Sequence, residues 1–367
     1  MITRFEAHAP DADLDDLRAR LAAARLPEAE TAGDQGVPLA DLAEVVDYWR
    51  TEYDWRAFEA RLSRVGQFRT TIDGLGIHFL HRRSTRADAT PLILTHGWPG
   101  SVAEFIDVID ELADPADADA PAFHVVAPSL PGFGYSDKPT APGWGTEKIA
   151  AAWVELMGRL GYQRFLAHGG DWGGVITTIL GGLFPEQVLG IHTLTPQAPP
   201  GLSSDNLTAS EREWAEETRD FWLHRAAYAK QQAARPQTIG YSLVDSPVGL
   251  LAWILDKFTE WTDVTVPRDR VLDDVTLYWL TRTGASAARI YYESHDSLDP
   301  DLRVDVPAAI SVYPRDIEKC PQPWAQERFR RIVRWTTPET GGHFPSLEVP
   351  GYFVNDLRAS LAAVQRC

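Results

Sequence analysis

The sequence has little of what disulfide-stabilised, metal-clustering or membrane-spanning proteins depend on. Its two cysteines, Cys320 and Cys367, are too few for a disulfide framework or a cysteine metal cluster. No window approaches the roughly 18 consecutive apolar residues of a membrane span, and the first residues lack the apolar core of a signal peptide. We therefore expect a cytoplasmic protein that has no membrane partner.

Positive charge is also scarce, since the formal net charge is −17. This balance argues against nucleic acid or an anionic lipid surface as a partner. The sequence contains no metal-ligand spacing and no phosphate-cradling glycine loop, and Gly132 and Gly134 fit an ordinary turn. We expect no cofactor and no metal. The sequence does not indicate whether the protein forms a homo-oligomer.

What the chain does contain is a large apolar share, 44% of 367 residues, enough for the core of one large domain with a lid or of two domains. Short β-rich runs alternate with helix-like segments such as 146–160. This alternation predicts a mostly parallel sheet covered by helices on both faces. The predicted strands are 77–81, 92–95, 123–126, 165–168, 188–194, 308–312 and 332–335.

Two regions depart from this alternation. The first 85 or so residues read as helical, with one amphipathic segment at Leu14–Leu21 and another from Leu39 to about Leu62, and then as irregular. Between 196 and about 300 the strand pattern stops. An all-helical insertion in an α/β pattern indicates a lid. Its predicted helices are 210–235, 247–258, 270–283 and 285–294.

The most informative stretch is "GGDWGG" at 169–174, which lies between a strand-like run and a helix-like run. A strand, a tight turn of small residues and a helix are the setting of a nucleophile elbow, in which the central residue is usually serine. Here that residue is Asp171. A carboxylate attacks saturated carbons such as those of epoxides and alkyl halides. The product is an ester, which water can cleave, whereas serine would leave an ether.

A nucleophile elbow predicts an acid and then a histidine later in the chain. "GGHFP" supplies His343, the expected base that deprotonates water, and Asp316 follows the strand 308–312 closely enough to orient the imidazole. Glu318 and Glu339 are competing acids.

"HGWPGS" at 96–101 follows the strand 92–95, so its backbone N–H groups are expected to face the elbow. The backbone amides of Trp98 and Trp172 are the predicted oxyanion-hole donors. The sequence does not indicate whether the Trp98–Pro99 peptide bond is cis or trans. Opening an epoxide also requires a proton donor, for which tyrosine is suited. The lid region offers Tyr228, Tyr241, Tyr278, Tyr291 and Tyr292.

With these motifs in view, the sequence resembles the microsomal-type epoxide hydrolases of the α/β-hydrolase superfamily. The likeness covers nearly the whole chain. It includes "DLRARLAAARLP" and "YWRTEYDWRAFEARL", which are similar to the epoxide hydrolase N-terminal domain, and "PLILTHGWPGSVAEF" and "VVAPSLPGFGYSDKP" in the hydrolase core.

The resemblance implies an α/β-hydrolase fold with a mostly parallel central sheet, a helical lid and an N-terminal helical and meander segment. It implies an N-terminal domain at 1–85, a hydrolase core at 86–195 and 301–367, and a lid at 196–300. It also implies Asp171 as nucleophile, His343 as base and Asp316 as the charge-relay acid. Tyr228 and Tyr291 match the ring-opening tyrosines, although Tyr292 is an alternative for the second.

The expected reaction is hydrolysis of a small epoxide, hydrophobic or aryl, by water to a vicinal diol, in detoxification or in secondary metabolism. A haloalkane or haloacid dehalogenase is the alternative enzyme, because it shares the aspartate, the histidine and the Asp-Trp pair. A non-catalytic ligand-binding protein on the same scaffold is the alternative outside enzymes. The tyrosine pair and the N-terminal segment favour the epoxide hydrolase.

Overall fold

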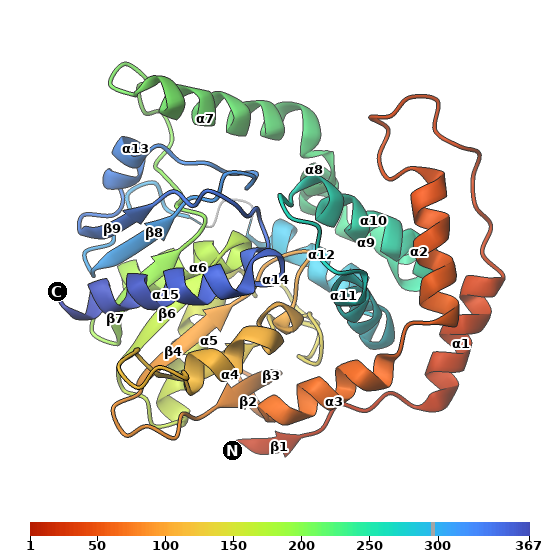
Figure 1. The fold of residues 1–367 in the computed structure, drawn as a ribbon, viewed down its shortest axis with the longest axis horizontal. Coiled ribbons are helices and arrows are strands. Elements are labelled where there is room, and N and C mark those ends of the chain that lie inside the picture. Colours follow the sequence, from red (N-terminus) through yellow and green to blue (C-terminus); the bar gives the residue numbers. More distant parts are fainter. Residues whose placement is uncertain (295–297) are drawn as a thin grey trace.

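The computed structural model describes residues 1–294 and 298–367, and within these the chain forms a nine-stranded sheet (Figure 1). The strand order is β1-β2-β3-β5-β4-β6-β7-β8-β9, and from β5 to β9 the neighbouring strands run parallel. The prediction of a mostly parallel α/β-hydrolase sheet is confirmed. The strands are β1 Thr3–Phe5, β2 Gln67–Ile72, β3 Leu75–Arg82, β4 Thr90–Thr95, β5 Phe123–Pro128, β6 Phe165–Gly169, β7 Val188–Thr193, β8 Ala308–Ser311 and β9 Ile332–Thr336.

Alternate side chains of the central strands face two separate cores. In β4, Ile93 packs into the core under α5 and α6, whereas Leu92 and Leu94 pack into the core under α3, α4 and α15. Both cores are apolar because the parallel strands are covered on both faces. The helices outside the lid are α1 Asp11–Ala22, α2 Leu39–Thr51, α3 Trp55–Val65, η1 Val102–Phe105, α4 Ile106–Ala113, α5 Thr146–Arg159, α6 Asp171–Leu183, α13 Gln322–Gln326, α14 Pro345–Glu348 and α15 Pro350–Gln365.

The N-terminal segment contains the helices and the meander that the family resemblance implied, but its first two strands were not identified from the residues. Strands β1 and β2 were read as part of a helical and irregular region, but both pair antiparallel and extend the sheet through β3. The turn between β2 and β3 is Asp73-Gly74, and both residues have positive φ, 47° and 79°. An Asp-Gly pair in this conformation is a strong hairpin signal, which the sequence analysis overlooked.

Between β7 and β8 the chain forms the predicted helical insertion, hereafter the lid. The segment 210–235, expected as one helix, is divided by a π-helical turn, η2, and 236–245 forms a further helix that was not predicted. The segment 39–62 is likewise two helices, because Asp54 caps a new helix by accepting from the N–H of Arg56. The lid helices are α7 Ala209–Asp220, η2 Phe221–Arg225, α8 Ala227–Ala234, α9 Pro236–Asp245, α10 Pro247–Glu260, α11 Arg268–Thr281 and α12 Gly284–Glu293.

The N-terminal helices lie along the outer side of the lid (Figure 1). Two side chains of the N-terminal segment donate hydrogen bonds to α11. The indole N–H of Trp49 in α2 donates to the hydroxyl of Thr276 at 2.9 Å, and the hydroxyl of Tyr53 donates to Asp273 at 2.9 Å. The N-terminal segment, whose strands β1 and β2 belong to the sheet, therefore attaches the lid to the sheet. Among the described residues no single helix has the length and apolar content to cross a membrane, and the bent pair α9–α10 meets that test only as a pair.

Candidate active site

The elbow places Asp171 at the first turn of α6, directly after β6 and Gly170. Asp171 has a positive φ of 50°, a strained conformation for a residue with a side chain. A Cβ atom on Gly169 would collide with the carbonyl of Gly173, and one on Gly173 would collide with the carbonyl of Thr95. The small residues of "GGDWGG" are therefore required for this turn to pack against β4.

Backbone N–H groups face the Asp171 carboxylate, as the sequence predicted. The N–H of Trp98 donates to Asp171 Oδ1 at 2.8 Å, across a turn in which the Trp98–Pro99 bond is cis. Burial raises the pKa of Asp171, and the positive charge of His343 and hydrogen bonds from the N–H groups of Trp172 and Trp98 oppose this effect. These two N–H groups form an arrangement that can stabilise negative charge on the carboxyl oxygen.

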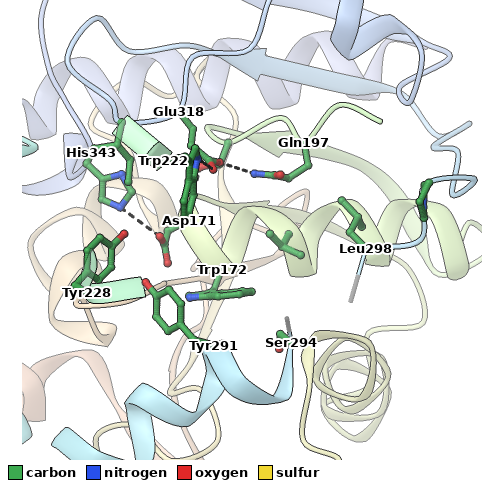
Figure 2. Close-up of a pocket in the computed structure, with 14 residues that line it drawn as sticks. Asp171, Trp172, Gln197, Trp222, Tyr228, Tyr291, Ser294, Leu298, Glu318 and His343 are labelled. Atoms are coloured by element: carbon green, nitrogen blue, oxygen red, sulfur yellow. Dashed lines mark hydrogen bonds and ion pairs between the residues drawn. The ribbon is translucent and has the colours of Figure 1, made fainter. Parts of the chain in front are cut away.

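His343 and Asp316 meet beside the elbow. The Nδ1 atom of His343 lies 2.7 Å from Asp316 Oδ1. On the other side of the ring, the Nε2 atom of His343 lies 3.6 Å from Asp171 Oδ2, a contact that Figure 2 shows. Of the competing acids, Glu339 is exposed. Glu318 instead accepts hydrogen bonds from Gln197 and Trp222. The order Asp171, His343, Asp316 in space is the order of a nucleophile, its base and the acid that orients the base.

The loop that carries His343 is attached to the lid. The backbone N–H of His343 donates to the carbonyl of Trp261, and a Cβ atom on Gly342 would collide with the same carbonyl. Glu348 accepts from the N–H groups of Phe344 and Asp263, which ties the loop to the segment after α10. No local pattern in the sequence marks Glu348, because one of its partners, Asp263, comes from a distant part of the chain.

Burial lowers the pKa of His343, but the charge and hydrogen bond of Asp316 and the charge of Asp171 outweigh it and raise the pKa to about 9. The imidazole is therefore protonated at neutral pH. Any reaction that removes the charge of Asp171 removes one of the causes of this high pKa.

Two of the five lid tyrosines face the elbow. Tyr228 in α8 stacks on the indole of Trp98, with ring centroids 5.1 Å apart, and Tyr291 in α12 makes an edge contact with Trp172 at 4.9 Å. Both hydroxyl groups point toward Asp171 (Figure 2). Burial raises the pKa of each tyrosine well above its ordinary value, so both stay protonated donors.

The remaining tyrosines lie elsewhere. Tyr292, the alternative to Tyr291, is 57% exposed and borders a surface hollow outside the site, and Tyr241 is 70% exposed. Tyr278 is buried and donates to the carbonyl of Gly100 at 2.9 Å.

Asp171, His343, Tyr228 and Tyr291 border a cavity of about 440 Å³. Most of its other walls are apolar or aromatic, and Gln197 and Glu318 provide a polar side that the sequence analysis did not identify as part of the pocket. Within 1–294 and 298–367 no group of three or more His, Cys, Asp or Glu side chains is placed to hold a metal ion. The remaining wall residues are Trp172, Val175, Thr195, Trp222, Ser294, Leu298, Pro300 and Ile317.

The sheet, the elbow and the acid–histidine pair define an α/β-hydrolase, and residues 90–240 match the family model described as "alpha/beta hydrolase fold". Residues 2–105 match the model "Epoxide hydrolase N terminus". The chain is 47% identical over 369 residues to a Stigmatella aurantiaca protein named "Putative epoxide hydrolase", spanning 97% of this chain and 84% of that protein. The chain belongs to the epoxide hydrolase family.

Further relatives agree with this membership. Epoxide hydrolase 1 of Sus scrofa is 30% identical over 410 residues, spanning 100% of this chain and 89% of that protein. The solved structure of Aspergillus niger epoxide hydrolase superposes with a TM-score of 0.91 at 34% identity, covering 99% of this chain and 97% of that one. The juvenile hormone epoxide hydrolase of Bombyx mori superposes with a TM-score of 0.93 at 28% identity, covering 100% and 95%.

Replacing Asp316 with asparagine should lower the pKa of His343, because it removes the carboxylate charge that raises this pKa. The titration of the His343 imidazole, followed by NMR in protein labelled with ¹⁵N-histidine, measures the shift. Glu339→Gln, which neutralises the exposed competing acid, is the matched control and should leave the titration unchanged. An unchanged pKa in Asp316→Asn would contradict the assigned pairing.

The same variant has a consequence for stability. The folded-state pKa of His343, about 9, lies above its ordinary value of 6.5, so its interactions stabilise the fold fully below about pH 6.5 and are lost as the pH rises through about 9. The difference in Tm between the natural protein and Asp316→Asn should therefore be larger at about pH 6 than at about pH 10.

Proposed function

We propose that this protein hydrolyses an epoxide to a vicinal diol through an ester on Asp171. The observation that carries the proposal is the meeting of a buried carboxylate nucleophile with two protonated tyrosine hydroxyls across one apolar cavity. A carboxylate and paired proton donors on opposite sides of a bound molecule suit the opening of a strained ring.

In the first half-reaction, Asp171 Oδ2 attacks one epoxide carbon. A carbon–oxygen bond forms to the carboxylate while the carbon–oxygen bond of the ring breaks. The ring oxygen takes a proton from Tyr228 or Tyr291, both of which remain protonated at neutral pH. The product is a hydroxyalkyl ester of Asp171.

In the second half-reaction, water attacks the ester carbonyl carbon and gives its proton to His343. The ester has no negative charge, so the contribution of Asp171 to the high pKa of His343 is lost and the neutral imidazole becomes accessible. The N–H groups of Trp98 and Trp172 stabilise the oxyanion. When the bond between Cγ and the substrate oxygen breaks, the proton remaining on the water oxygen passes to the substrate oxygen. The diol leaves, the Asp171 carboxylate is restored and the proton held by His343 returns to the tyrosinate.

The cavity supports a hydrophobic epoxide, with an aryl group as a suitable substituent. Its volume of about 440 Å³ and its tryptophan, leucine and isoleucine walls suit a compact apolar molecule. Epoxides of this kind arise both as toxic metabolites and as biosynthetic intermediates, so we propose a role in detoxification or secondary metabolism. The tyrosine pair favours this reaction over a dehalogenase, whose halide product requires N–H donors in place of a proton donor.

Asp171→Ala should abolish diol formation from styrene oxide, with a loss of about 10³-fold or more, because no other group can form the ester. Gas chromatography of the diol measures this loss. Asp73→Ala is the matched control, since Asp73 also has a positive φ but lies in the exposed β2–β3 turn. Full activity in Asp171→Ala, or halide release from a chloroalkane without diol formation by the natural protein, would contradict the proposal.

Tyr228→Phe and Tyr291→Phe should each slow ester formation by about 10- to 100-fold, because each removes one proton donor to the ring oxygen. Ester hydrolysis should change far less, because water attack does not use the ring oxygen. Single-turnover experiments with rapid quenching separate the two rates. Tyr292→Phe, which alters the exposed neighbour, is the control, and an unaltered rate of ester formation in both pocket variants would rule out the assigned role.

A further inference from the structure

A second and much smaller cavity, of about 20 Å³, lies beside Asp171 and His343. Among the described residues, Asp171 and His343 are the two that border both this cavity and the 440 Å³ pocket. The other walls of the small cavity are the "HGW" turn, η1, the residues after His343, the ends of β4, β6 and β7, and one side of α15. Its volume accommodates one water molecule, since a single site needs about 10–15 Å³, and it is too small for an epoxide.

Glu104 in η1 borders this small cavity. Its carboxyl group lies against the Cα atom of Gly100, where any Cβ atom would collide with it. The N–H of Glu104 donates to the carbonyl of Ser101, which fixes the backbone of η1. The glycine at position 100 therefore makes room for a carboxyl group beside the catalytic pair.

The Glu104 carboxyl group also interacts electrostatically with the charged groups of the site. Burial and the nearby carboxyl of Asp274 raise the pKa of Glu104 well above its ordinary value, with His343 opposing and Asp171 adding to the effect. The raised pKa favours the neutral carboxylic acid, which can both donate and accept a hydrogen bond. Asp274 is itself buried, accepts from Ser101 at 2.5 Å, and has a pKa raised to about 8 by burial.

We propose that Glu104 is a positioning residue for ester hydrolysis, whose carboxyl group binds the attacking water in the small cavity and directs it at the ester carbonyl of Asp171. The inference rests on the proposed function, because it requires the ester. Three polar groups then surround the water: the Glu104 carboxyl, the Nε2 atom of His343 and the carbonyl group of the ester.

The step balances without a net proton transfer to Glu104. One proton of the water moves to His343 Nε2 as the bond from the water oxygen to Asp171 Cγ forms. The bond between Cγ and the ester oxygen then breaks, the substrate keeps that oxygen, and the proton left on the water oxygen passes to it, which gives the diol and the Asp171 carboxylate. Glu104 accepts a hydrogen bond from the second water proton. The epoxide and the water thus reach Asp171 from two different cavities, so a bulky ester in the large pocket does not displace the water.

The test compares Glu104→Met with Glu104→Gln in single-turnover reactions with styrene oxide, with ester formation and decay followed by rapid quenching. Methionine has a similar length but cannot hydrogen-bond like a carboxyl group, whereas glutamine keeps an acceptor and a donor. Glu104→Met should slow ester hydrolysis roughly tenfold or more, as expected for the loss of one hydrogen bond to the reacting water, and leave ester formation within about threefold. Glu104→Gln should restore most of the rate of hydrolysis.

Glu147→Met, the same substitution at an exposed glutamate of α5, is the matched control and should leave both rates unchanged. Glu104→Ala serves if methionine impairs folding, as judged by Tm, and the same slowing is expected. Hydrolysis at the natural rate in Glu104→Met, or equal slowing of both half-reactions, would overturn the inference. Absence of any ester in the natural protein and in His343→Gln would instead contradict the proposed function, and with it the inference.

Discussion

The site depends on holding one carboxylate, that of Asp171, in a buried position where water cannot solvate it. Burial alone would favour the protonated, unreactive acid. The backbone N–H groups of Trp98 and Trp172 and the imidazolium of His343 replace the lost water, and each is fixed by a separate part of the fold. The positive φ of Asp171 and the glycines around it are the backbone cost of bringing these groups together.

The lid and the N-terminal helices complete this environment. Tyr228 and Tyr291 come from the lid, and the carbonyl of Trp261 at the end of α10 binds the backbone of His343. The lid is attached to the N-terminal segment, because Trp49 in α2 and Tyr53 after it form hydrogen bonds with α11. The N-terminal segment therefore fixes one helix of the lid, and the lid carries the two tyrosines that we propose as proton donors.

The sequence was sufficient for features that depend on local pattern. The elbow around Asp171, the loop of His343 and the strands of the parallel sheet follow from spacing and from runs of apolar residues. The strands β1 and β2 were not identified from the residues, although the family resemblance implied a meander and Asp73-Gly74 is a local signal. The division of 210–235 arises from a π turn with no clear signature. The approach of Glu104 to the catalytic pair depends on how η1 packs behind the elbow, which no local pattern encodes.

The most direct test of the central claim is the intact mass of His343→Gln after incubation with excess styrene oxide. Without its base the protein should stop at the ester and gain the mass of one epoxide, located on Asp171 by peptide mapping. His224→Gln, which replaces an exposed histidine of the lid, is the control. This variant should gain no lasting mass, because the ester on Asp171 is hydrolysed when His343 is present. An unmodified His343→Gln protein, or a label on a residue other than Asp171, would contradict the covalent mechanism.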